Sequence, residues 1–105
     1  MVLAIDIGNT NIVIGCIQNK ECLFVERLST VHQKTEIEYA IDIKTVLDIY
    51  HIDVEQIEGG IISSVVPQVT NAAKLALEKI LKKNVMVVGA GVKTGLNIRM
   101  DNPSS

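Results

Sequence analysis

The sequence predicts an α/β fold built on a mixed sheet, with elements in the order β-β-β-α-β-α-β. Three observations predict this order. Apolar, β-branched runs fill most of the first 29 residues, two segments with helical spacing of apolar residues follow, and each segment precedes a short apolar run. A length of 105 residues suits one domain, residues 1–105, and 48% hydrophobic with 21% charged content is typical of folded chains.

The first two apolar runs, residues 2–7 and 12–17, are predicted to pair as a hairpin because β-branched residues fit a pleated, buried surface. Residues 8–11, Gly-Asn-Thr-Asn, should form its turn, since Gly and Asn tolerate positive φ at low steric cost. The polar residues 18–21 then connect to a third strand over residues 22–29. These three strands form an antiparallel meander.

The first turn has the composition of a phosphate-binding loop. Successive main-chain N–H groups in a tight Gly-containing turn can point into one concavity, and short hydroxyl or amide side chains add donors. Asp6 just before the turn would repel phosphate, unless it faces a divalent cation or the waters of that cation. The alternative is an ordinary polar turn in which Asp6 caps main-chain amides.

Thr35, with Glu38 three residues later, has the spacing of a capping box and predicts a helix over residues 36–51. Its expected buried face contains Tyr39, Ile43, Val46, Leu47 and Tyr50, broadened by Ile37, Ala40 and Ile41. His32 and His51 lack a second ligand at metal-binding spacing, so they are interpreted as surface or helix-terminal residues.

Residues 61–66 predict a strand that ends in two serines and two valines. Pro67 fits the first turn of a following helix, because its missing N–H costs little there. The expected narrow face of this helix contains Ala73, Ala76, Leu77 and Ile80. Asn84 is the expected left-handed stop, and residues 85–88 form one more short buried strand.

Residues 89–95 are rich in glycine but match neither common nucleotide fingerprint. A dinucleotide fingerprint opens a helix, whereas residues 96–100 look extended. In a Walker loop a glycine precedes the lysine, and here Val92 takes that place. We expect a flexible connection that leads to a substrate-facing segment.

Composition argues against two classes of partner. The net charge is −2, no dense Lys/Arg run occurs and aromatic content is 3%, so a nucleic-acid surface is not expected. No apolar run reaches the length of a membrane span, and Met1 leads directly into a strand, so we expect no membrane partner and a cytoplasmic protein.

Cys16 and Cys22 flank the second turn. A turn of two or four residues puts them on opposite faces of the sheet, and a turn of three puts them opposite each other. Reduced core thiols are expected in either case.

Three stretches carry a resemblance to a known family. D-x-G-N-T at residues 6–10, followed by an apolar strand and Gly15, resembles the first phosphate motif of the acetate kinase, sugar kinase, Hsp70 and actin superfamily. D-I-G-N-T-N resembles type III pantothenate kinases in particular. Residues 63–67 with Thr70, and residues 91–99 with the Asp-Asn-Pro at 101–103, match that family in the same order.

The resemblance implies a ribonuclease-H-like mixed sheet with its first strand near the centre, as one half of a two-domain kinase. It implies ATP-dependent phosphorylation of pantothenate to 4′-phosphopantothenate, the first step of coenzyme A synthesis. The implied ATP-phosphate segment is Asp6, Ile7, Gly8, Asn9, Thr10, Asn11, Ile12 and Val13. Asp6 would act through Mg²⁺ or its waters.

The resemblance also implies parts that this chain does not contain. The catalytic Asp, in a Gly-x-Asp-Arg motif, is expected just after Ser105, and the site of a monovalent cation (K⁺ or NH₄⁺) and the second domain lie beyond it. Residues 1–105 alone are therefore expected to be inactive, and the full-length protein is expected to be a homodimer.

Met100 stands where the family often carries an aromatic residue that lines the pantothenate site. A Met can fill the same apolar volume without a ring or hydroxyl, or it can simply pack in the core. The alternatives for the whole chain are a non-catalytic nucleotide-binding relative and a transcriptional regulator of the same fold. The acidic balance counts against the regulator's DNA-contacting surface.

Overall fold

A computed structural model describes residues 1–89, so the segments expected at residues 90–100, including Met100, lie outside the described residues. Five strands form one sheet in the order β3-β2-β1-β4-β5, and two helices lie on it. The elements are β1 (Val2–Ile7), β2 (Asn11–Gln18), β3 (Glu21–Ser29), α1 (Glu36–Ile49), the short 3₁₀ helix η1 (Val54–Gln56), β4 (Gly59–Ser64), α2 (Pro67–Leu81) and β5 (Val85–Val88). The predicted order of strands and α-helices and the central position of the first strand are confirmed.

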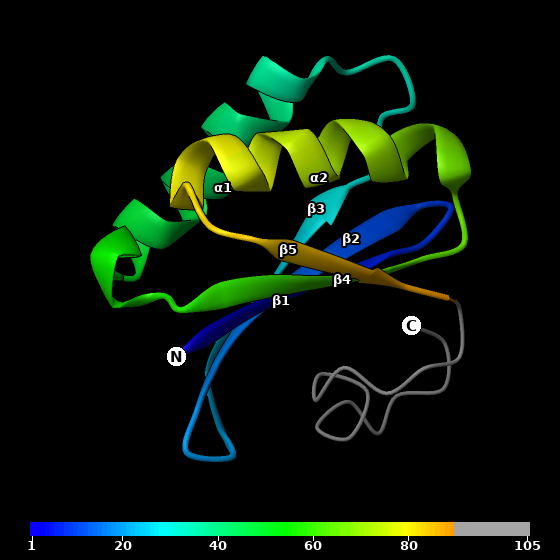
Figure 1. Cartoon of the computed structure of the whole chain (residues 1–105). Coiled ribbons are helices and arrows are strands. Elements are labelled where there is room, and N and C mark those ends of the chain that lie inside the picture. The colour runs from blue at the N-terminus through cyan, green and yellow to red at the C-terminus, as the bar shows by residue number, and fades with distance from the viewer. Residues whose placement is uncertain (90–105) are drawn as a thin grey trace.

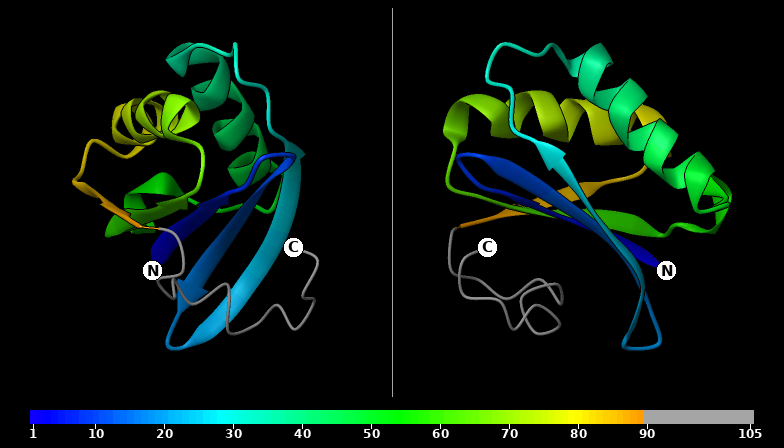
Figure 2. Two further views of the ribbon diagram at one scale, coloured as in Figure 1. Left: turned by 90° about the vertical axis from the view of Figure 1, so that its right-hand side faces the viewer. Right: turned by 180° about the vertical axis from the view of Figure 1, so that it is seen from behind.

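Both helices cover the same face of the sheet (Figure 1), and the two turned views in Figure 2 agree. Strand β1 is antiparallel to β2 and parallel to β4, which makes the sheet mixed. Because side chains alternate along a strand, Leu3, Ile5 and Ile7 enter the core under the helices. Ala4 joins a separate small cluster with Val13 on the opposite face. Asp6 falls on that opposite face as well, since it lies two residues after Ala4.

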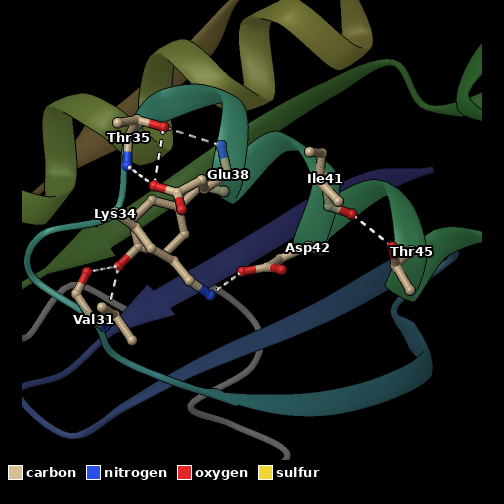
Figure 3. A network of polar contacts seen from close by, with 8 residues as sticks. Val31, Lys34, Thr35, Glu38, Ile41, Asp42 and Thr45 are labelled. Atoms are coloured by element: carbon tan, nitrogen blue, oxygen red, sulfur yellow. Dashed lines mark hydrogen bonds and ion pairs between the residues drawn. The ribbon is translucent and has the colours of Figure 1, made fainter.

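Helix α1 begins at the predicted capping box (Figure 3). The Thr35 main-chain N–H donates to Glu38 Oε1 at 2.8 Å, and the Glu38 N–H donates to Thr35 Oγ1 at 3.4 Å. Tyr39, Ala40, Ile43, Val46 and Leu47 are buried as predicted. Ile37 and Ile41 are more than half exposed, and Tyr50 is 38% exposed at the C-cap, so the predicted burial was wrong for all three. The helix ends at Ile49, before the predicted His51.

Helix α2 starts with Pro67 in its first turn, as predicted. Its left-handed stop is Lys82, with φ of 57°, and not Asn84. The Lys82 N–H donates to the Glu78 carbonyl at 2.7 Å and closes the last turn of α2. The chain therefore changes direction at Lys82 and enters β5 at Val85. No helix within residues 1–89 is long and apolar enough to span a membrane.

The β2–β3 turn consists of Asn19 and Lys20, whose φ values are 53° and 66°. Such left-handed pairs match the twist of the flanking strands. Ile17 pairs with Cys22, and a bulge follows Cys16. Cys16 therefore enters the core under the helices, Cys22 packs at the opposite face, and both are free thiols.

Candidate functional site

The β1–β2 turn is closed by a hydrogen bond from the Gly8 N–H to the Asn11 carbonyl at 2.8 Å. None of its four residues has a left-handed φ, so the expectation that positive φ explains this turn was wrong. Gly8 is favoured here for another reason. A Cβ at this position would lie only 3.2 Å from the Asn11 oxygen, which is closer than side chains normally approach.

Thr30, just after β3, holds the turn from one side. Its main-chain N–H donates to the Thr10 carbonyl at 3.0 Å, and its Oγ1 donates to the Gly8 carbonyl at 2.8 Å. Three turn carbonyls, those of Gly8, Thr10 and Asn11, are thus acceptors in internal hydrogen bonds. Three of the four carbonyl oxygens that would repel an anion therefore accept hydrogen bonds from the protein itself.

The donors of the turn are left free. Within residues 1–89, the main-chain amides of Asn9 and Thr10 donate to no acceptor, and both residues are exposed. Thr10 Oγ1 accepts from Asn11 Nδ2 at 3.2 Å, so its own hydroxyl proton can still be donated outward. The turn presents hydrogen-bond donors to solvent, which is the chemistry that an anion requires.

Replacing Thr30 with Val should destabilise the fold by about 1 kcal/mol, because the Gly8 carbonyl loses its partner while the shape of the side chain is kept. Thr30→Ser keeps the hydroxyl and is the matched control, expected to stay closer to the wild type. Urea unfolding of the three proteins measures the difference. Equal stability of the Val and Ser variants would contradict this role of the hydroxyl.

A cleft of about 320 Å³ opens beside the turn on the side away from the helices. Seven of the eight residues in the expected ATP-phosphate segment line it. The exception is Ile12, which is buried in the core on the other face. The lining residues are Asp6, Ile7, Gly8, Asn9, Thr10, Asn11, Val13, Arg27 and Val65.

Among the residues that the structure describes, Asp6 is the one acidic residue that lines this cleft. Burial raises the pKa of its carboxyl, and no hydrogen bond or ion pair from residues 1–89 compensates its charge. On the neighbouring strands Asp6 is in register with Val13 and with the buried Ser63. A partly buried, unpaired carboxylate is costly unless a cation reaches it.

The described side chains at this cleft fit a Mg²⁺ ion that is held jointly by the protein, waters and a substrate, and they do not form a metal site made of protein ligands alone. No group of three or more His, Cys, Asp or Glu side chains gathers anywhere in the described part of the chain. Mg²⁺ is usually held by one or two carboxylates, several waters and the phosphates of a substrate. One carboxylate beside a turn that presents hydrogen-bond donors fits such an arrangement.

The Ser-Ser-Val-Val-Pro stretch positions the start of α2 beside the turn (Figure 1). The Val66 N–H donates to Ser64 Oγ at 2.9 Å, and Thr70 Oγ1 donates to the Val66 carbonyl at 2.9 Å. The Val65 N–H donates to the Ile7 carbonyl at 3.1 Å. The hydroxyls of this motif therefore hold the β4–α2 connection, which places Val65 in the cleft wall.

Arg27 and Val65 are cleft residues that sequence reasoning missed. Arg27 pairs with Val13, and Val13 pairs with Asp6, so one row of the sheet brings these three residues to the same face. Counting residues outward from the two hairpin turns would pair Val13 with Glu26, and the bulge between β2 and β3 shifts this pairing by one residue to Arg27, so the sequence carried no sufficient signal. Val65 carried no signal either.

Comparison with known proteins identifies the family. The family model described as type III pantothenate kinase matches residues 2–105. The chain belongs to the type III pantothenate kinase family. It is 42% identical over 103 residues to the type III pantothenate kinase of Halalkalibacterium halodurans, covering 98% of this chain and 41% of that protein. It is 42% identical over 105 residues to that of Bifidobacterium animalis subsp. lactis, covering 100% of this chain and 42% of that protein.

The type III pantothenate kinase resemblance seen in the three motifs is thus confirmed. The chain spans about two fifths of the length of these curated relatives. Among solved structures, it matches a putative N-acetylglucosamine kinase of Porphyromonas gingivalis with a TM-score of 0.65 and 19% identity, over 85% of this chain and 34% of that one. At this identity the likeness shows the fold alone, and it confirms the α/β, ribonuclease-H-like prediction.

Proposed function

We propose that the complete protein carrying this chain phosphorylates pantothenate with ATP and forms 4′-phosphopantothenate, and that residues 1–105 are its amino-terminal phosphate-binding domain. Family membership supports the reaction. The observation that carries the site is the β1–β2 turn, three of whose four carbonyls accept internal hydrogen bonds while its donors face a cleft beside a carboxylate that has no partner within residues 1–89.

In this proposal the Asn9 and Thr10 amides and the Thr10 hydroxyl hold oxygens of the β- and γ-phosphates. Asp6 holds Mg²⁺ directly or through its waters, and the ion neutralises charge on the phosphates. Ile7, Gly8, Asn11, Ile12 and Val13 keep the turn in shape, Ile12 from within the core. Phosphoryl transfer depends on such positioning and charge neutralisation, with little covalent help from the protein.

The remaining parts of the proposal concern the whole enzyme. We place the catalytic Asp and the monovalent-cation site after Ser105, in the part of the protein that its longer relatives also possess. Met100 is the proposed contact to pantothenate within this chain. ATP and pantothenate are the proposed partners, with no nucleic acid, in a cytoplasmic homodimer. Residues 1–105 by themselves are proposed to be inactive.

Purified complete protein, given ATP, Mg²⁺ and pantothenate, should form 4′-phosphopantothenate, and mass spectrometry detects that product directly. Residues 1–105 under the same conditions are the control and should give only background. Absence of product from the complete protein would refute the proposed reaction. Turnover by residues 1–105 well above background would refute the proposal that they are inactive.

A further inference from the structure

Arg27 faces Asp6 across the width of the cleft. It lies on β3 and pairs with Val13 of β2, which in turn pairs with Asp6 of β1. Paired residues on neighbouring strands point to the same face of a sheet, and neighbouring strands are about 4.8 Å apart. The main chains of Arg27 and Asp6 are therefore about 10 Å apart, their side chains lie on the face away from the helices, and the β1–β2 turn lies beside them.

Arg27 has no anionic partner within residues 1–89. Every ion pair in this part of the chain uses a lysine or the amino terminus. The adjacent Glu26 is in register with Ile14, so its side chain points to the helix-covered face, where its Oε1 accepts from the Tyr50 hydroxyl at 2.8 Å. Arg27 is exposed and, among residues 1–89, is the one cationic side chain that lines the cleft.

The negative charge of the proposed ligand would be balanced in part by the positive charge of Arg27. ATP that carries one Mg²⁺ is still an anion, and Asp6 adds a further negative charge to the same cleft. Exposed amides and a hydroxyl bring partial charges only. A guanidinium is always protonated and its planar fork matches the oxygens of a phosphate.

Resting on the proposed function, we propose that Arg27 binds non-bridging oxygens of the β- and γ-phosphates of ATP, from the side of the cleft opposite Asp6. The two side chains then divide the ligand between them. Asp6 binds the metal, Arg27 binds the oxygens that the metal leaves uncovered, and the donors of the adjacent turn fix the phosphate chain. Arg27 thereby acts as a nucleotide-binding residue supplied by the third strand, outside the D-x-G-N-T motif.

Calorimetric titration of the complete protein with ATP, ADP and AMP, each with Mg²⁺, tests this role. Arg27→Gln should weaken ATP binding by about ten- to a hundredfold, ADP binding less, and AMP binding hardly at all. Arg27→Lys should fall between, because it keeps the charge but loses the planar fork. Raising the salt concentration should narrow the difference between the wild type and Arg27→Gln for ATP.

Lys44→Gln is the matched control, since it removes one positive charge from the exposed surface of α1 on the other face of the sheet. It should bind all three nucleotides as the wild type does, and thermal melting should show that each variant is folded. Unchanged ATP binding by Arg27→Gln, or an equal loss for ATP, ADP and AMP, would overturn the role of Arg27. In either case the proposed function would still stand if the wild type has kinase activity. A wild type that binds no ATP would overturn both.

Discussion

Replacing Asp6 with Asn is expected to lower the turnover number of the complete protein by about a thousandfold at saturating ATP. Asp6 is the one acidic side chain among residues 1–89 that lines the cleft, so no other carboxylate in that part of the chain can replace its charge. An amide keeps the size and one oxygen but loses the negative charge that would hold Mg²⁺ in the proposed site. Steady-state assays of 4′-phosphopantothenate formation, with the Mg²⁺ concentration varied, measure the effect.

The same variant allows a control that separates loss of the metal from misfolding. Binding of ATP without Mg²⁺ should be unchanged or tighter in Asp6→Asn, because a like charge beside the phosphates has been removed. Wild-type turnover by Asp6→Asn would contradict the assignment of the metal to this carboxylate.

The difference in folding stability between Asp6→Asn and the wild type should depend on pH, because only the wild type carries the titrating carboxyl. Burial raises the pKa of Asp6 above its ordinary value of 3.8, so the folded state is penalised only when the carboxylate is charged. The penalty is absent below pH 3.8 and grows as the pH rises through the folded-state pKa. The variant should therefore be more stable than the wild type at pH 7, with the difference vanishing in acid. Urea unfolding across this pH range measures it.

Gly60→Ala is expected to destabilise the fold by about 1–3 kcal/mol. A Cβ at Gly60 would lie 2.6 Å from Cδ2 of Leu77, where β4 passes beneath α2. Leu77 is completely buried, so its methyl group has no open space into which to move. Differential scanning calorimetry and urea unfolding measure the loss.

Gly59 supplies the matched control for Gly60. A Cβ at Gly59 would meet only the Asn84 carbonyl at an ordinary 3.5 Å, so Gly59→Ala should be neutral or slightly stabilising. Leu77→Ala should cost about 2–5 kcal/mol as a cavity. In that background Gly60→Ala should cost almost nothing, because the clash is gone. Additive losses from the two substitutions would show that Leu77 is not the obstacle.

Sequence reasoning succeeded for the fold wherever the signal was local. The Thr35–Glu38 capping box and Pro67 depend on neighbours within one turn, so they could be predicted without knowing the tertiary structure. Sequence reasoning failed where contacts between distant segments determine whether a side chain is buried. The exposure of Ile37 and Ile41 depends on how much of α1 the sheet and α2 can cover, which helical periodicity does not reveal.

In the candidate site too, residues close together in the sequence were predicted and residues brought in by the tertiary structure were not. Residues 6–11 are contiguous and form a strand end and a turn, so the motif alone could predict that they lie together, and all six line the cleft. Ile12 was included only because it continues the motif, although alternation along β2 sends its side chain to the core. Arg27 is far from the motif in sequence and enters the cleft through the register of three strands, which the motif cannot show.

The main-chain amides of the β1–β2 turn offer the most direct test of phosphate binding. An amide-resolved NMR titration of the complete protein with Mg²⁺ and ATP should shift the signals of Asn9 and Thr10 strongly. The signals of Asn19 and Lys20, in the second hairpin turn, should remain in place and serve as the internal control. Signals of Asn9 and Thr10 that stay unmoved at saturating ATP would contradict the central claim that this turn holds the phosphates.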